Sequence, residues 1–317
     1  MAAALTSIFS FDGARVRDDY LSAEQFMRHC DCILSSKPLA KRPHSHPVDF
    51  SPGRILYAKL DDYVGNFDSF RGQRNRVVLV SSESDIAITR RRIRQKPSQV
   101  HHWFATDVVE PGPGVSGLPL GLANSYCGVT LKAPLLANRS RPLSERPSWL
   151  YVNFRPETSP SVRAPIMEHF ADLADAKWLT VRRSTLDLGT FLDELTSHRF
   201  VICPEGSGVE SHRMWEALYS RTIPIVTRNP ALEPFADLPI LAVDDFRMVT
   251  REFLQTEYQR MTARKWNHEL MFLPWWGERF REESKAARRA NQGRLSTMEY
   301  FCERVRHRFR SVLQRFR

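Results

Sequence analysis

The chain has 317 residues, of which 42% are hydrophobic and 26% are charged, and it carries a net charge of +10. This length suits two domains with a core each, and it excludes a peptide or a lone small module. No run of eighteen apolar residues occurs, so the sequence predicts no membrane-spanning helix.

The N-terminal half predicts one domain over residues 1–145. A helix is expected over 17–35, and strands are expected at 54–60, 76–81 and 100–105. A glycine- and proline-rich connection follows at 111–119, and the proline-containing stretch 133–147 is typical of a short linker.

The second half predicts another domain over residues 146–275. Strands at 149–154, 178–181, 200–203, 223–226 and 240–243 alternate with helical segments. Such alternation is typical of a parallel sheet with crossover helices, in which ligands bind beyond the carboxyl ends of the strands. Residues 276–317 form a basic tail, and its end, 297–317, has the pattern of an amphipathic helix.

The stretch Phe200–Val226 combines a buried strand, a loop with two glycines, a helix start and a second buried strand. Because the first N–H groups of a helix lack partners and attract anions, this loop predicts a phosphate site. Arg213 supplies a bidentate donor, and the nearby carboxylates suit sugar hydroxyls. The candidate substrate-binding residues are Arg155, Glu205, Gly206, Ser207, Gly208, Glu210, His212, Arg213 and Glu216.

This stretch also carries a resemblance to known enzymes. The pattern Gly206-x-Gly208-x-Glu210-Ser211-His212-Arg213-x-x-Glu216-Ala217-Leu218, followed by Ile223-Pro224-Ile225-Val226, resembles the donor-binding half of exostosin-like glycosyltransferases and, more distantly, of α-fucosyltransferases. Two further segments are similar to segments of these families: Leu150–Phe154 with Arg155, Thr158 and Arg163, and Leu118–Leu122.

The resemblance implies an α/β protein of GT-B type, with two Rossmann-like domains whose parallel sheets face each other across a cleft. It implies a glycosyltransferase in which the second domain binds a nucleotide sugar and the first presents a glycan or lipid-linked acceptor. The adjacent pairs Asp61-Asp62 and Asp244-Asp245 are not the Asp-x-Asp motif of metal-dependent transferases. We therefore expect no obligatory cofactor and no metal.

Two departures from the family pattern stand out. Arg221 and Thr222 occupy a turn that usually carries a glycine, so the backbone there either avoids a positive φ or tolerates its cost. The spacing of Glu205 and Glu216 also differs from the signature of retaining GT-B enzymes. A noncatalytic protein that binds an anionic glycan or nucleic acid on a degenerate transferase scaffold is therefore the alternative hypothesis.

The acceptor-side base is left open by the sequence. Inverting sugar transfer requires a carboxylate or histidine near the acceptor hydroxyl. The N-terminal half offers several carboxylates that suit this role, and nothing in their spacing selects one: Asp61, Asp62, Glu83, Asp85 and Asp107.

The cysteines and histidines predict neither disulfides nor a metal site. The five cysteines are an odd and scattered set, and the spacing of Cys30 and Cys32 is closer than that of zinc ligands. The first twenty residues have neither a basic leader nor a long apolar segment, which predicts a cytoplasmic protein.

Basic residues are concentrated at 71–96 and in the tail. For the expected helix at 297–317, packing across the domains is the favoured interpretation, and binding to an anionic membrane surface comes second. Binding to an anionic membrane surface would make this a peripheral protein at the inner face of the membrane. Nucleic-acid binding is the least favoured, since no recognised nucleic-acid-binding motif is present.

Overall fold

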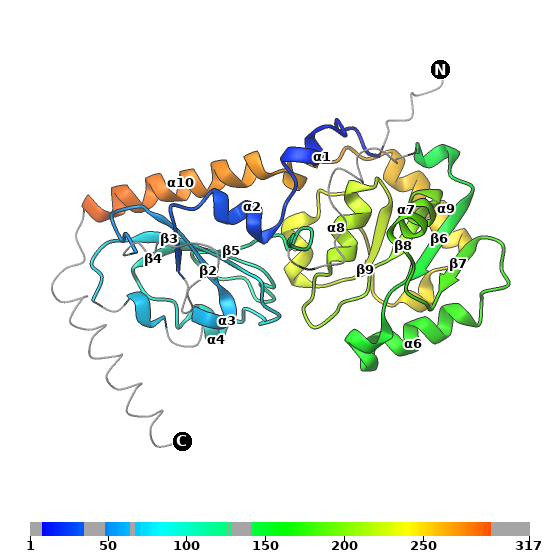
Figure 1. Ribbon diagram of the computed structural model, residues 1–317, viewed down its shortest axis with the longest axis horizontal. Helices are drawn as coiled ribbons and strands as arrows, with labels where there is room; N and C mark the ends of the chain where they lie inside the picture. Colours follow the sequence, from blue (N-terminus) through cyan, green and yellow to red (C-terminus); the bar gives the residue numbers. More distant parts are fainter. Residues whose placement is uncertain are drawn as a thin grey trace.

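The computed structural model describes residues 8–34, 48–63, 67–70, 72–125, 127 and 141–292. These form two domains that lie side by side, each built on a five-stranded sheet (Figure 1). Most of the expected linker at 133–147 and the expected helix at 297–317 lie outside the described residues.

The N-terminal sheet contains β1 (Cys32–Leu34), β2 (Ile55–Lys59), β3 (Val77–Ser82), β4 (Val100–Ala105) and β5 (Val115–Gly117). The strands lie in this order and all pair in parallel. The short helices α3 (Leu60–Tyr63) and α4 (Arg90–Ile93) follow β2 and β3. The three strands expected in this half are confirmed as β2, β3 and β4.

The expected helix over 17–35 is wrong. The segment instead forms α1 (Arg15–Asp18), α2 (Ala23–Arg28) and strand β1. Ser22 is extended and its hydroxyl accepts a hydrogen bond from the N–H of Gln25, so a new helix begins there. Cys32 then pairs with Leu56 of β2, and this long-range pairing overrides the helical periodicity.

The C-terminal sheet contains β6 (Ser148–Asn153), β7 (Leu179–Arg182), β8 (His198–Ile202), β9 (Ile223–Thr227) and β10 (Leu241–Val243). The helices of this domain include α6 (Pro160–Ala171), α7 (Leu188–Ser197), α8 (His212–Tyr219) and α9 (Arg251–Thr262). The strand order is β10-β9-β8-β6-β7, and all pairs are parallel. The order therefore reverses between β6 and β8, which makes their carboxyl ends the switch point of the sheet.

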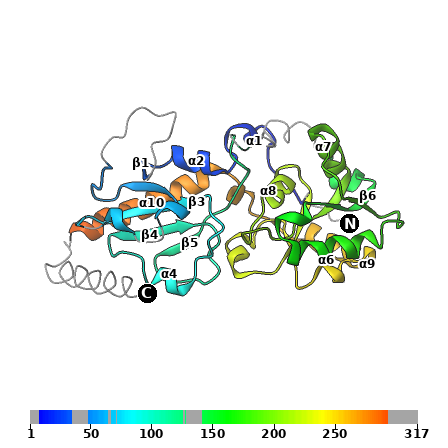
Figure 2. The same ribbon diagram turned by 60° about the horizontal axis from the view of Figure 1, so that its bottom comes forward.

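Helix α10 (Leu273–Gln292) follows the last strand of the C-terminal sheet in the chain and returns to the N-terminal domain. It crosses back and covers β3 and β4, with the Phe280 ring 4.8 Å from that of Phe104 and 6.1 Å from that of Phe26. Figure 2 shows the two sheets in separate halves of the molecule, with α10 running along the N-terminal one.

The N-terminal segment makes the reciprocal crossing. The Phe11 ring packs 5.5 Å from that of Phe272, and His268 Nε2 is hydrogen-bonded to the carbonyl of Ile8. The chain thus has the α/β fold of two Rossmann-like domains that the sequence predicts, with both chain crossings holding the halves together.

Candidate functional site

The carboxyl ends of β6 and β8 meet at the switch point, where the loops 154–159 and 203–211 leave the sheet. Helix α8 starts directly after the second loop. The N-cap residue Ser211 has extended backbone angles, but its hydroxyl caps no N–H group. Ser211 Oγ is buried and has no hydrogen-bond partner within the described residues. The start of α8 therefore carries a hydroxyl group that makes no hydrogen bond within the described residues.

Arg163, in the second turn of α6, joins the two loops. Its Nε donates to the carbonyl of Glu205 at 2.8 Å, and its Nη1 and Nη2 donate to the carbonyls of Arg155 and Pro204, both at 3.2 Å. The side chain is buried, and burial, followed by the nearby Arg213 charge, lowers its pKa. Among the described residues, Arg163 has no carboxylate partner.

Gly206 lies against this guanidinium. A Cβ at Gly206 would be 3.2 Å from Arg163 Nη2, so any larger residue would crowd the arginine. The Gly206 N–H also bonds to the carbonyl of Gly208 at 3.0 Å, which closes a tight turn in the loop. Glycine at 206 thus keeps the backbone open beside a buried positive charge.

Arg213 in the first turn of α8 also points to the switch point. Its Nη1 donates to the carbonyl of Asn153 at 2.6 Å, and its Nε donates to Glu216 at 3.0 Å. The guanidinium carbon lies 4.3 Å from the centre of the Phe191 ring. These contacts use Nε and Nη1, while Nη2 donates to no acceptor that the described part of the chain provides. Arg213 is therefore fixed in place with one terminal amino group still available.

The 203–211 loop is also held from the other domain. Asp107 follows β4, and its Oδ1 accepts hydrogen bonds from the N–H groups of Val209 at 3.1 Å and Glu210 at 3.4 Å. A Cβ at Gly208 would lie 2.5 Å from Asp107 Oδ2, so only glycine allows this approach. The carboxyl-end loops of the two sheets therefore touch at this point.

Two further contacts complete this connection between the domains. Glu210 Oε2 accepts the N–H of Leu120 at 3.1 Å and the indole N–H of Trp215 at 2.8 Å. His212 Nδ1 is hydrogen-bonded to the carbonyl of Gly121 at 2.8 Å. We call the Asp107, Glu210 and His212 contacts the interdomain clasp.

Both carboxyl groups of the clasp are buried, each with 6% of its surface exposed. Burial raises the pKa of Asp107 to about 6 and that of Glu210 to about 8. The N–H donors lower both pKa values, but the loss of hydration outweighs them. Glu210 is thus protonated at neutral pH.

The structure brings the other predicted site residues to the same loops. Arg155 is exposed, and its carbonyl is the one that Arg163 binds. Glu205 is half-buried and Ser207 is exposed at the turn. The family resemblance includes Arg163, but its contacts with three carbonyl groups could not be read from the sequence, because these partners lie on two separate loops.

The turn after α8 tolerates a positive φ. Arg221 has a φ of 58°, and its N–H and that of Thr222 bond to the carbonyls of Leu218 and Ala217. Arg221 Nη2 donates to the carbonyl of Phe11 at 2.8 Å. The missing glycine is therefore replaced by a side chain that fastens the N-terminal segment.

The acceptor-side carboxylates differ in environment. Asp85 is exposed, and Asp61 accepts a hydrogen bond from the Ser84 hydroxyl. The Asp62 side chain lies outside what the structure describes. Asp107 belongs to the clasp.

Glu83, directly after β3, has a φ of 61° and is half-buried. Its Oε1 accepts from Asn124 Nδ2 at 2.6 Å, and its Oε2 accepts from the Tyr57 hydroxyl at 3.3 Å. Burial raises its pKa. A strained backbone, fixed oxygens and a raised pKa are features of functional carboxylates.

Among the described residues, no group of three or more His, Cys, Asp or Glu side chains is arranged to hold a metal ion. In the same part of the chain, the helices are all too short or too polar to cross a bilayer.

No protein-family model matches the chain. A search of curated proteins found no match either. Among solved structures, the chain is similar to a crystal structure of an α1,3-fucosyltransferase, with a TM-score of 0.38 and 14% sequence identity. The similarity covers 70% of this chain and 71% of that one.

Proposed function

We propose that the protein is a glycosyltransferase that binds the diphosphate of a nucleotide sugar at the switch point of its C-terminal sheet. The observation that supports this most directly is a buried positive charge there, that of Arg163, which lacks an ion-pair partner in the described part of the chain. Glu216 pairs with Arg213, whereas the buried Arg163 forms no ion pair among the described residues. A buried charge is costly unless it is paired, so an anion between the loops would stabilise the site.

A diphosphate fits this position by its chemistry. Arg213 Nη2, the Ser211 hydroxyl and the first N–H groups of α8 are donors, and Gly206 leaves the backbone accessible. In sugar transfer, negative charge develops on the leaving diphosphate, and prepositioned donors stabilise it without requiring a metal ion. The proposal therefore includes metal-independent transfer of an exostosin-like type to a glycan or lipid-linked acceptor.

Glu83 is the acceptor-side base in this proposal. Its two hydrogen bonds orient the carboxylate, and its raised pKa brings it closer to the pH at which it accepts a proton from a sugar hydroxyl. The reaction would form a new glycosidic bond to the acceptor oxygen, break the bond between the sugar and the diphosphate, and leave the hydroxyl proton on Glu83.

Nucleotide binding tests the donor site directly. Isothermal titration with UDP, GDP and CDP, each beside its monophosphate, should give one diphosphate that binds at least about tenfold more tightly than its monophosphate, as expected from one charged hydrogen bond. Arg213→Ala should remove this difference. Arg228→Ala is the matched control, because Arg228 follows β9 of the same sheet and pairs with Asp244 on the surface.

If no nucleoside diphosphate binds, or if Arg213→Ala binds as the wild type does, the donor site is refuted. A protein that binds nucleotides but never hydrolyses or transfers any nucleotide sugar would support the noncatalytic alternative.

A further inference from the structure

A second charged region lies far from the switch point. Four segments meet at the amino ends of β2, β3 and β4 and at the end of α10: residues 51–54, 72–76, 94–99 and 285–292. They contain one, two, two and three Lys or Arg residues respectively, and no Asp or Glu. We call this surface the basic pole. Figure 1 places it at the end of the molecule away from the C-terminal domain.

Hydrogen bonds hold these segments together. The Gly53 N–H donates to the carbonyl of Arg76 at 2.8 Å, and the Arg76 N–H donates to Asn291 Oδ1 at 2.8 Å. Gln99 Nε2 reaches the carbonyl of Gln73 at 3.1 Å. The positive charges are therefore gathered by the fold and do not merely follow one another in sequence.

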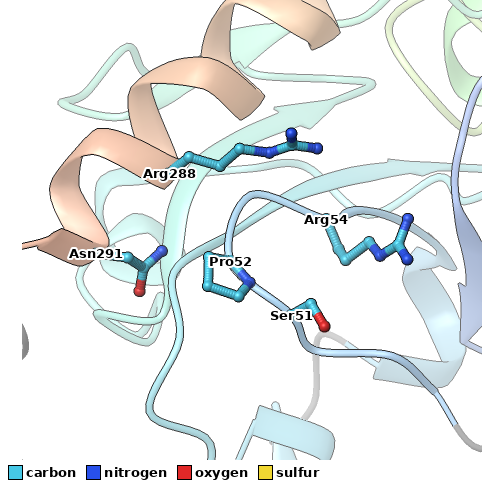
Figure 3. Close-up of a pocket in the computed structure, with 5 residues that line it drawn as sticks. All are labelled: Ser51, Pro52, Arg54, Arg288 and Asn291. Atoms are coloured by element: carbon cyan, nitrogen blue, oxygen red, sulfur yellow. The ribbon is translucent and has the colours of Figure 1, made fainter.

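The basic pole contains a pocket of about 530 Å³, lined by Ser51, Pro52, Arg54, Arg288 and Asn291. Figure 3 shows the guanidinium groups of Arg288 and Arg54 extending to the same side of the loop that carries Pro52. Arg54 is paired with Asp49 and Asp31, whereas Arg288 forms no ion pair with any residue that the structure describes.

The backbone N–H of Arg76 is bonded to Asn291, which lines this pocket. The side-chain Nε of Arg76 is buried and lacks a hydrogen-bond partner in the described part of the chain. The pocket lining thus offers the guanidinium groups of Arg54 and Arg288 as donors to an anionic group.

We propose that the basic pole docks on a membrane surface that contains anionic lipids, with a lipid phosphate in the pocket between Ser51 and Arg288. The four segments contain no Phe, Tyr or Trp, so they offer no platform for stacking nucleic-acid bases. Clusters of basic residues are typical of binding to acidic lipid headgroups.

Vesicle sedimentation with the full-length protein tests this inference independently of the enzymatic proposal. The wild type should sediment with vesicles of phosphatidylcholine plus phosphatidylglycerol but not with phosphatidylcholine alone, and salt should release it. Each basic residue near such a surface changes partitioning about fivefold, so Arg288→Ala with Arg289→Ala should weaken it about 25-fold.

The control variant combines Arg247→Ala with Arg251→Ala, which removes the same charge from exposed positions in the C-terminal domain. Equal binding by both double variants would overturn the assignment of the pole. The proposal also fails if phosphatidylglycerol does not increase vesicle binding. It fails as well if binding to heparin or single-stranded DNA depends on Arg288 and Arg289 but binding to vesicles does not.

Discussion

The clasp residue Glu210 makes the folding stability dependent on pH in an unusual direction. Its pKa is about 8 in the folded protein, raised from 4.5 by burial. A carboxyl group whose pKa is raised by folding stabilises the protein fully below the unfolded pKa, and this contribution is lost as the pH rises through the folded pKa. Between these values the folded state holds one proton more, so the free energy of unfolding falls by about 1.4 kcal/mol per pH unit.

Glu210→Gln removes this dependence, because the amide is neutral and its oxygen still accepts the N–H groups of Leu120 and Trp215. From pH 5.5 to 7.5, the free energy of unfolding of the wild type should fall by about 2.5 kcal/mol relative to that of the variant. Buried histidines titrate in both proteins, and the difference between the two cancels them.

Guanidinium denaturation followed by tryptophan fluorescence gives both free energies at each pH. Glu252→Gln, at an exposed position in α9, controls for the loss of one acidic side chain. Parallel pH profiles for the wild type and Glu210→Gln would refute the assignment of a protonated Glu210 in the folded protein.

Three further predictions concern Gly208, Glu83 and Asp107. Gly208→Ala should destabilise the protein by about 1–3 kcal/mol, because its Cβ would meet Asp107 Oδ2 at 2.5 Å; thermal denaturation should show that Asp107→Ala relieves this penalty in the double variant. Glu83→Gln should lower kcat by about 100-fold or more without changing nucleotide affinity, and a parallel loss of affinity or folding in calorimetry would indicate a structural role instead. Asp107→Ala should strengthen nucleoside diphosphate binding in isothermal titration, and unchanged or weaker binding would contradict the competition described below.

The alternating strands and helices of the C-terminal domain are predictable because each buried parallel strand is a short continuous apolar run. Phe200–Ile202 and Ile223–Val226 are such runs, and both are strands in the structure. The helix over 17–35 fails for the opposite reason. Its apolar spacing is helical, but Ser22 starts a new helix and the pairing of Cys32 with Leu56 depends on a distant segment.

In the candidate site, too, local features could be predicted from the sequence and long-range contacts could not. The glycines and Arg213 could be recognised from one local stretch, since a strand, a loop and a helix start follow one another there. The reason for Gly208 could not, because the carboxylate that approaches it belongs to Asp107, and the bond from Val209 to Asp107 spans 102 residues. Local patterns reveal where a loop lies, and the tertiary contacts decide which groups in it are available.

Those contacts lead to a specific relation between donor binding and the domain interface. Asp107 places a carboxylate oxygen on the N–H groups of Val209 and Glu210, directly before α8, which is where an anion is favoured by the helix dipole. In the proposed donor site, a diphosphate bound to Arg213 and the start of α8 would lie beside Asp107 or displace it. In the first case the two negative charges would repel each other, and in the second the diphosphate would have to replace two hydrogen bonds of Asp107, so the carboxylate should weaken diphosphate binding in both cases. Because the pKa of Asp107 is raised to about 6, protonation below that pH removes the repulsion, and diphosphate affinity should increase there in the wild type but not in Asp107→Ala.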